Sequence, residues 1–306
     1  MNFKLSTSFF NINADHGLSK WQMRAYKLSN LLNNSFPNSF LDKELKIKKF
    51  LLDSQTLEKF WPEIEPTSSP SRALSNLFWF SLPWKKIKAE LGEINVFDTG
   101  CGSGNYGKFL IEKANTTISS YTGTDFKENS NWKNLEKNFF NFHFFCSDSA
   151  NILSCIPKKT NLFISQSAIE HFSKDLLYFK QIRKFIINTN RPIFQIHLFP
   201  SAACLHLYRF HGIRQYTPRT ISKITRLFPN STKKLFFLGG SACNLLHYNF
   251  ITKQKNKGLS DLRLSDTKKY INLLKEKITE DINLKNLNQP SFYALIIHSN
   301  INQKTF

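Results

Sequence analysis

Short apolar runs alternate with amphipathic segments along the chain from Ile94 onward. Runs rich in β-branched and aromatic residues, bounded by Gly, Asn or Asp, are typical of buried strands, whereas apolar residues at helical spacing indicate helices. Runs that fit a strand cover 94–99, 120–126, 142–148, 161–167, 192–199, 233–239 and 292–299. The pattern predicts an α/β fold, a seven-stranded sheet with helical crossovers.

The segments between these runs predict helices over 105–114, 173–188, 217–228 and 265–282. Thr217 and Pro218 form a cap and first-turn pair at the start of one of them. The last of these helices belongs to a long helical insert, residues 240–290, ahead of the final strand. Residues 1–90 read as mostly helical, with one helix over 40–52. We therefore expect a helical extension or lid over 1–90 and a sheet domain over 91–306.

The stretch LFWFSLPW, residues 77–84, is unusually aromatic for a connector. The favoured interpretation is a hydrophobic strap that packs the N-terminal helices on the sheet. Two alternatives stay open, a lid over a ligand site and a contact with a membrane surface.

Composition narrows the class of protein. The 306 residues are 41% hydrophobic, which predicts a folded protein, and no apolar run approaches the length of a membrane span. The first residues lack the apolar core of a signal peptide, so we expect a cytoplasmic protein. The net charge of +20 is spread along the chain without a long basic run, which leaves nucleic acid as an alternative partner. The scattered cysteines show no metal-ligand spacing, although a divalent ion bound by scattered acids stays open.

The segment DTGCGSGNYG, residues 98–107, concentrates glycines between a predicted strand and a predicted helix. Glycine adds nothing to packing, so the segment predicts that a ligand lies against the backbone. The lysine-containing pattern of a phosphate-binding P-loop is absent, whereas Gly102, Gly104 and Gly107 match the weaker dinucleotide pattern.

Acidic residues close three successive predicted strands, at Asp98, Asp125 and Asp148. Ligands of open α/β sheets bind beyond the carboxyl ends of the strands. Together with Gln166, at the end of the fourth strand, these side chains are expected to converge on one crevice.

The motif DTGCGSG resembles the acid-x-G-x-G-x-G turn of class I S-adenosylmethionine (SAM)-dependent methyltransferases, whose Rossmann-like sheet adds an antiparallel last strand to six parallel ones. The stretch SQSAIEHF resembles one common in the members that methylate small molecules. The resemblance implies SAM as cofactor. It implies that Asp98 holds the amino end, that Asp125 takes both ribose hydroxyls and that Asp148 and the main-chain N–H of Ser149 bracket the adenine. The remaining implied cofactor contacts are Gly100, Gly102, Gly104, Tyr106 and Gln166.

Methyl transfer to a hydroxyl needs a base near the ends of the fourth and fifth strands. His171 with its neighbour Glu170 is the first candidate, and His197 is the next. The segment around the end of the fifth strand predicts a wall for a polar acceptor, formed by His197, His206, His211, Tyr208, Arg209, Arg214 and Tyr216. No metal ligands are assigned.

Residues 65–300 also resemble bacterial methyltransferases of surface-polysaccharide biosynthesis. That resemblance implies O-methylation of a sugar or glycan intermediate, either a small molecule or a lipid-linked acceptor. The alternatives are an RNA methyltransferase, a non-catalytic SAM-binding or scaffold protein of the same fold, and a nicotinamide enzyme.

Overall fold

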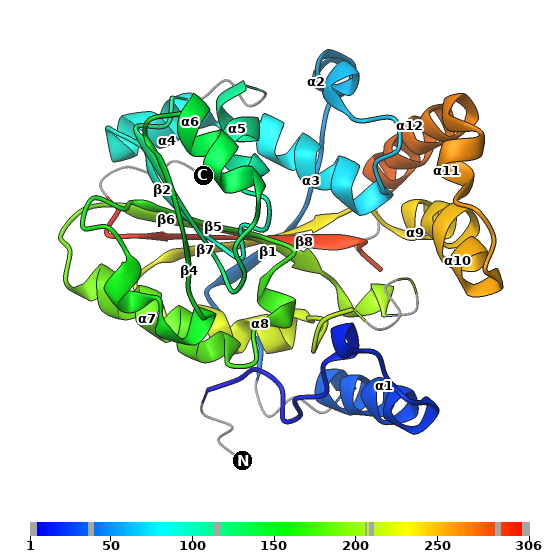
Figure 1. The fold of residues 1–306 in the computed structure, drawn as a ribbon, viewed down its shortest axis with the longest axis horizontal. Coiled ribbons are helices and arrows are strands. Elements are labelled where there is room, and N and C mark those ends of the chain that lie inside the picture. The colour runs from blue at the N-terminus through cyan, green and yellow to red at the C-terminus, as the bar shows by residue number, and fades with distance from the viewer. Residues whose placement is uncertain are drawn as a thin grey trace.

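The computed structural model describes residues 5–35, 40–112, 117–205, 207, 211–284 and 289–301. A single mixed sheet has the strand order β1-β7-β8-β6-β5-β2-β3-β4, with helices on both faces (Figure 1). Its strands are β1 (Leu45–Lys49), β2 (Asn95–Thr99), β3 (Ser120–Asp125), β4 (Phe142–Cys146), β5 (Leu162–Gln166), β6 (Ile193–Pro200), β7 (Thr232–Leu238) and β8 (Phe292–Ser299). All seven predicted strands are confirmed. β8 runs antiparallel to β6 and β7, and the other pairings are parallel.

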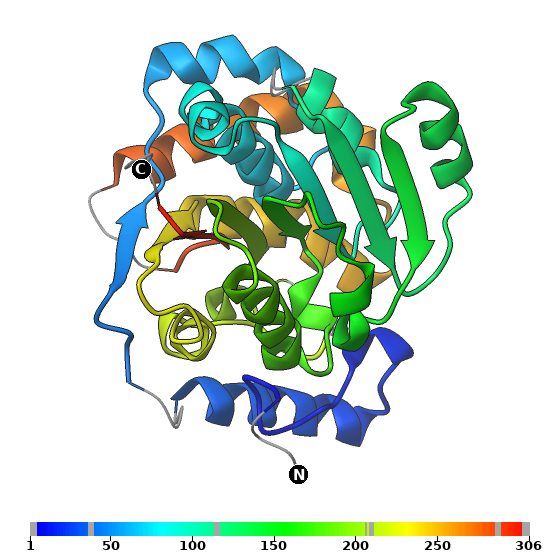
Figure 2. The ribbon, with the colours of Figure 1, turned by 90° about the vertical axis from the view of Figure 1, so that its left-hand side faces the viewer.

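The eighth strand, β1, overturns the predicted helix over 40–52. Its sequence LKIKK alternates apolar and charged residues, so that Leu45 is buried and Ile47 half-buried while Lys46 and Lys48 face solvent. β1 pairs in parallel with β7 and forms one edge of the sheet, opposite β4 (Figure 2). The sheet therefore has eight strands instead of seven, and part of the N-terminal region belongs to it.

Two hydrophobic layers flank the sheet. One face carries α3 (Pro70–Ser81), α4 (Trp84–Leu91), α5 (Asn105–Glu112), α6 (Asn131–Asn138), α9 (Ser241–His247) and α12 (Thr267–Asn283). The other face carries α7 (Asp175–Ile187) and α8 (Pro218–Thr225), with α1 (Lys20–Ser35) on the same side of the molecule (Figure 1). The remaining α-helices are α2 (Ser54–Phe60), α10 (Lys253–Lys257) and α11 (Leu262–Ser265). The helices predicted over 105–114, 173–188, 217–228 and 265–282 correspond to α5, α7, α8 and α12.

The aromatic stretch 77–84 packs into the core. Leu77 and Trp79 are fully buried, and Phe78, Phe80 and Trp84 are nearly so. These rings join α3 and α4 to the sheet and to α12, which is the packing role the sequence favoured. Their burial removes them as a membrane contact. Among the described residues, no helix combines the length and the apolar composition that a membrane span requires.

Candidate functional site

The glycines of the turn that follows β2 differ in what lies beside them. Gly100, Gly102 and Gly104 all have positive φ. A Cβ on Gly100 would lie 2.4 Å from the Ala168 Cβ, and one on Gly104 would lie 2.4 Å from the Phe144 ring, whereas nothing lies within 4 Å of one on Gly102. The protein's own packing therefore requires two of the glycines, and only Gly102 leaves open space beside its Cα.

Asp98 lies buried at the end of β2 with one oxygen left unpaired. The Tyr121 hydroxyl donates to Oδ2 at 2.6 Å, while Oδ1 has no hydrogen-bond partner. Burial raises the pKa of Asp98 to about 7, against the opposing effect of the Tyr121 hydrogen bond. A buried acceptor without a donor is costly, so this oxygen fits a ligand that brings a donor or a positive charge.

Asp125, at the end of β3, lies against the same glycine turn. Its Oδ2 accepts from the Gly102 N–H at 2.8 Å, and its Oδ1 accepts from the Phe126 N–H at 2.7 Å. Phe126 is 74% exposed, an unusual position for a large aromatic ring, and sequence reasoning missed it. Its only sequence signal is an aromatic residue directly after a strand-ending acid.

Asp148 and Ser149 follow β4 at the same edge of the sheet, because β4 pairs with β3 in parallel. Asp148 is exposed and caps a short 3-10 helix, its Oδ1 accepting from the Ala150 N–H at 2.9 Å. The Ser149 hydroxyl donates to Asp148 Oδ1 at 3.4 Å, and the Ser149 carbonyl accepts from Gln181. The role of both residues at an adenine ring stays a prediction.

α3 connects the glycine turn with the end of β5. The Trp79 indole N–H donates to Gln166 Oε1 at 3.1 Å, and the Arg72 guanidinium donates to the Tyr106 hydroxyl at 2.5 Å. Neither Arg72 nor Trp79 was predicted as a site residue. Trp79 belongs to the aromatic stretch 77–84, whereas Arg72 precedes that stretch.

A cavity of about 210 Å³ lies beyond the carboxyl ends of β5 and β6. Most of its lining residues have polar or charged side chains, and Gln166 belongs both to the wall and to the α3 contact. Ser167, at the turn after β5, has a positive φ of 51°, a strained conformation that recurs at functional sites. The lining residues are Ser69, Ser71, Arg72, Gln166, Ser167, Glu170, Pro200, His211 and Phe292.

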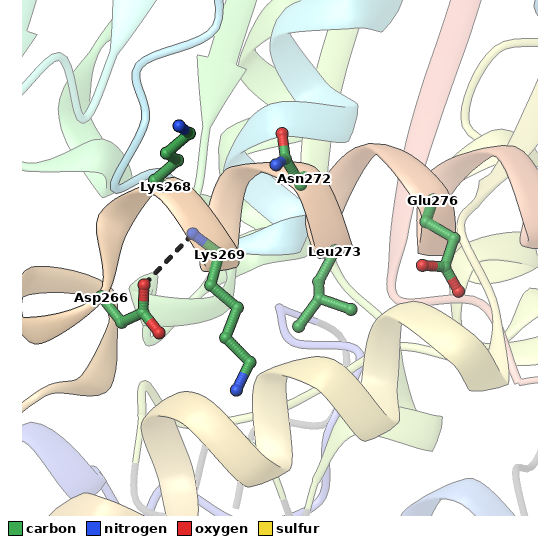
Figure 3. Close-up of a pocket in the computed structure, with 6 residues that line it drawn as sticks. All are labelled: Asp266, Lys268, Lys269, Asn272, Leu273 and Glu276. Carbon is green, nitrogen blue, oxygen red and sulfur yellow. Dashed lines mark hydrogen bonds between the residues drawn. The ribbon is translucent and has the colours of Figure 1, made fainter.

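A second depression of about 470 Å³ lies along α12 (Figure 3). It is lined by Asp266, Lys268, Lys269, Asn272, Leu273 and Glu276. Every lining residue belongs to α12 or its cap, and none comes from a strand end. This depression is a solvated helix surface and does not adjoin the glycine turn.

The predicted base His171 and the predicted wall residue His211 meet beside the cavity, and His211 lines it. His171 Nδ1 lies 2.6 Å from Asp15 Oδ2, and the His171 and His211 rings pack edge to face with centroids 4.5 Å apart. Glu170 is fully buried beside both rings. Burial alone would lower the pKa of His211, but the Glu170 and Asp15 carboxylates raise it above its usual value. Asp15 belongs to this site although no sequence motif marks it.

His197 does not belong to the site. Its side chain is fully buried against α7, with Nδ1 2.7 Å from the Ser165 hydroxyl, and burial lowers its pKa to about 3. Because strand side chains alternate in direction, its position in β6 turns the ring into the core instead of toward the strand end. The prediction of His197 as a base is therefore wrong.

The predicted polar wall after β6 needs a similar correction. Arg214 is 1% exposed and Tyr216 is fully buried, and both contact the buried carboxylate of Asp175. Arg214 Nε also donates to Ser8 Oγ at 2.9 Å, which fastens the N-terminal segment to the fold. Of the wall residues named from sequence, His211 lines the cavity, whereas His206, Tyr208 and Arg209 lie outside the described residues.

No family model and no curated protein sequence matches this chain. Among solved structures it is similar to the plantazolicin methyltransferase BamL in complex with a triazolic desmethylPZN analog and SAH, at 14% identity and a TM-score of 0.42 over 91% of this chain and 97% of that one. It is also similar to a putative sarcosine dimethylglycine methyltransferase from Galdieria sulphuraria, at 14% identity and a TM-score of 0.48 over 81% of this chain and 99% of that one. A SAM-dependent methyltransferase from Archaeoglobus fulgidus follows, at 18% identity and a TM-score of 0.44 over 80% of this chain and 98% of that one. These identities and TM-scores are too low to transfer a function, which leaves the site geometry to support one.

Proposed function

We propose that the protein is a SAM-dependent methyltransferase that acts on a hydroxyl of a small polar acceptor. One observation carries the proposal, the open face of Gly102 between two carboxylates at adjacent strand ends. Asp98 Oδ1 is buried without a partner on one side, and Asp125 accepts from the Gly102 N–H on the other. The pair suits a ligand that carries an ammonium group at one end and a ribose at the other.

The residues at these strand ends match the amino end, the ribose and the adenine of SAM. Asp98 would hold the amino end, and Asp125 would accept from the ribose, since a carboxylate accepts about four hydrogen bonds and the N–H groups of Gly102, Phe126 and Lys127 supply three. The exposed ring of Phe126 would stack on the adenine, with Asp148 and Ser149 beside it. SAM supplies a methyl group on a positively charged sulfur.

The cavity next to Gln166 supports a polar acceptor. Arg72, Gln166 and Glu170 bring donors and acceptors to a space of about 210 Å³, which suits a group rich in hydroxyls such as a sugar, free or linked to a lipid. The acceptor oxygen would take the methyl group that bound SAM supplies, with S-adenosylhomocysteine (SAH) as the by-product, and the hydroxyl proton would pass to a base.

His211 is the base that this arrangement favours, because it lines the cavity and lies beside the Glu170 carboxylate. His171 is held by Asp15 and is not among the cavity-lining residues, which suits a positioning role. Alignment of the two reactants would supply most of the rate enhancement.

Transfer of radiolabel from methyl-labelled SAM tests the proposal. The acceptor panel contains monosaccharides, sugar nucleotides, lipid-linked sugars, small amines and total RNA. Label in a hydroxyl compound that falls at least tenfold in Gly102→Ala supports the proposal. Label confined to RNA or amines overturns the acceptor class, and SAM binding without transfer to any member favours the non-catalytic alternative.

A further inference from the structure

Four charged or titratable side chains from three distant parts of the chain meet beside the cavity. Asp15 comes from the N-terminal segment, Glu170 and His171 follow β5, and His211 follows β6. One ligand atom each of Asp15, His171 and His211 lie within 4.8 Å of one another. Asp15 Oδ2 is 2.6 Å from His171 Nδ1, and Asp15 Oδ1 is 3.8 Å from His211 Nδ1. Both imidazoles thus turn the same ring nitrogen toward one carboxylate.

Glu170 occupies the opposite side of the two rings. Its Oε1 lies 3.7 Å from His211 Nε2 and 3.9 Å from His171 Nε2. The side chain is fully buried, and neither of its oxygens has a hydrogen-bond partner in the described structure. A buried carboxylate without a hydrogen bond is costly. With both imidazoles neutral, the cluster carries two carboxylates and no compensating cation of its own.

The backbone around the cluster holds these side chains in place. Gly212 donates its N–H to Asp15 Oδ1 at 3.0 Å, and its carbonyl accepts from the Ala14 N–H at 3.0 Å. Gly212 has a φ of +67°, and a Cβ there would lie 2.9 Å from the Glu170 carbonyl oxygen. The Tyr26 hydroxyl donates to the His211 carbonyl. The N-terminal segment is therefore docked so that Asp15 faces the two histidines.

We propose that Asp15, His171 and His211 bind a divalent first-row transition ion such as Zn²⁺, with Glu170 as the outer carboxylate that faces the Nε2 atoms of both imidazoles. Two imidazoles and a carboxylate are a common donor set for such ions, and a carboxylate behind a ligating imidazole fixes its tautomer. Three protein ligands leave a coordination position open.

The ion would stand beside the acceptor cavity, because His211 and Glu170 line it. Its role rests on the proposed function: with the ion bound, both ring nitrogens of His211 are engaged, so the ion takes over from His211 by lowering the pKa of the acceptor hydroxyl, whose proton then leaves to solvent, and by orienting the hydroxyl toward the methyl donor. The binding site itself does not depend on that function.

Calorimetric titration of the chelator-treated full chain with Zn²⁺, together with visible absorption after Co²⁺ addition, tests the proposal. Asp15→Asn keeps the shape of the side chain and His211→Gln keeps a polar group, so both variants are expected to fold, which thermal melts check. The matched control is His143→Gln, an exposed histidine on β4.

We expect one ion per chain in the wild type and in His143→Gln. Loss of a ligand should weaken binding by roughly 100-fold or more, and Glu170→Gln by about tenfold, because outer carboxylates contribute 10- to 100-fold to affinity. Absence of binding in the wild type, or equal binding in all variants, overturns the site. SAH titrations of the same samples separate the two proposals: ion binding without SAH binding defeats the proposed function alone, and SAH binding without ion binding defeats the metal site alone.

Discussion

The glycine turn offers a matched pair of substitutions whose effects should separate. Gly100→Ala and Gly102→Ala both place a side chain at positive φ, which costs roughly 1–2 kcal/mol. At Gly100 the new Cβ also lies 2.4 Å from the Ala168 Cβ, and such overpacking costs a further 1–3 kcal/mol or so. At Gly102 it meets nothing within 4 Å, and the stiffer unfolded chain returns about 0.4–1 kcal/mol. The unfolded chain of Gly100→Ala stiffens by the same amount, so the expected losses of unfolding free energy are about 1–4.5 kcal/mol for Gly100→Ala and about 1 kcal/mol for Gly102→Ala.

Binding should show the opposite order. A methyl group on Gly102 fills the space that the ligand is proposed to use, so we expect SAH affinity to fall at least about tenfold, equivalent to 1.4 kcal/mol. Urea unfolding measures the stability of both variants, and calorimetry with SAH measures their affinity. Wild-type SAH affinity in Gly102→Ala would show that no ligand crosses this face, and wild-type stability in Gly100→Ala would refute the packing explanation.

Three further predictions concern buried polar groups. The folded-state pKa of Asp98, about 7, lies above its unfolded value of 3.8, so between these values the folded state keeps a proton that the unfolded chain loses. The free energy of unfolding should therefore fall by about 4 kcal/mol in all as pH rises through this window. Urea unfolding at several pH values should show this fall in the wild type but not in Asp98→Asn, which should also lose SAH affinity. Arg214→Met leaves the Asp175 carboxylate buried without its cation, which should lower the free energy of unfolding by about 3–5 kcal/mol in urea. It should also expose residues 5–16 to protease, and an unchanged protease pattern would show that Arg214 does not anchor the N-terminal segment. His197→Gln should lower the free energy of unfolding by about 1–3 kcal/mol, because the buried Ser165 hydroxyl loses its hydrogen-bond partner. The turnover of labelled SAM should stay unchanged, and a large loss of kcat in a folded variant would show that His197 takes part in catalysis.

The strands and the strand-end acids could be predicted from sequence because both signals are local. Apolar runs mark each buried strand, and parallel strands bring Asp98 and Asp125 to one edge whatever the details of packing. β1 could not be predicted in the same way. Its five residues alternate too briefly to outweigh the helical pattern around them, and its partner β7 lies far away in the sequence.

The site residues show a second limit of the sequence. The sequence does not distinguish Gly100, Gly102 and Gly104. In the structure, Ala168 leaves no room for a side chain at Gly100, and Phe144 leaves none at Gly104. Asp15 carries no motif, and only the docking of the N-terminal segment on Gly212 brings it to His171. Contacts between distant segments depend on tertiary packing, which a local pattern does not encode.

Calorimetric titration with SAH and with NAD, on the wild type and on Asp125→Ala, tests the central claim most directly. The claim is that SAM lies across Gly102 between Asp98 and Asp125. We predict micromolar SAH binding by the wild type, at least tenfold weaker binding by Asp125→Ala, and no comparable binding of NAD. Binding of NAD alone, or SAH binding that does not depend on Asp125, would contradict the claim.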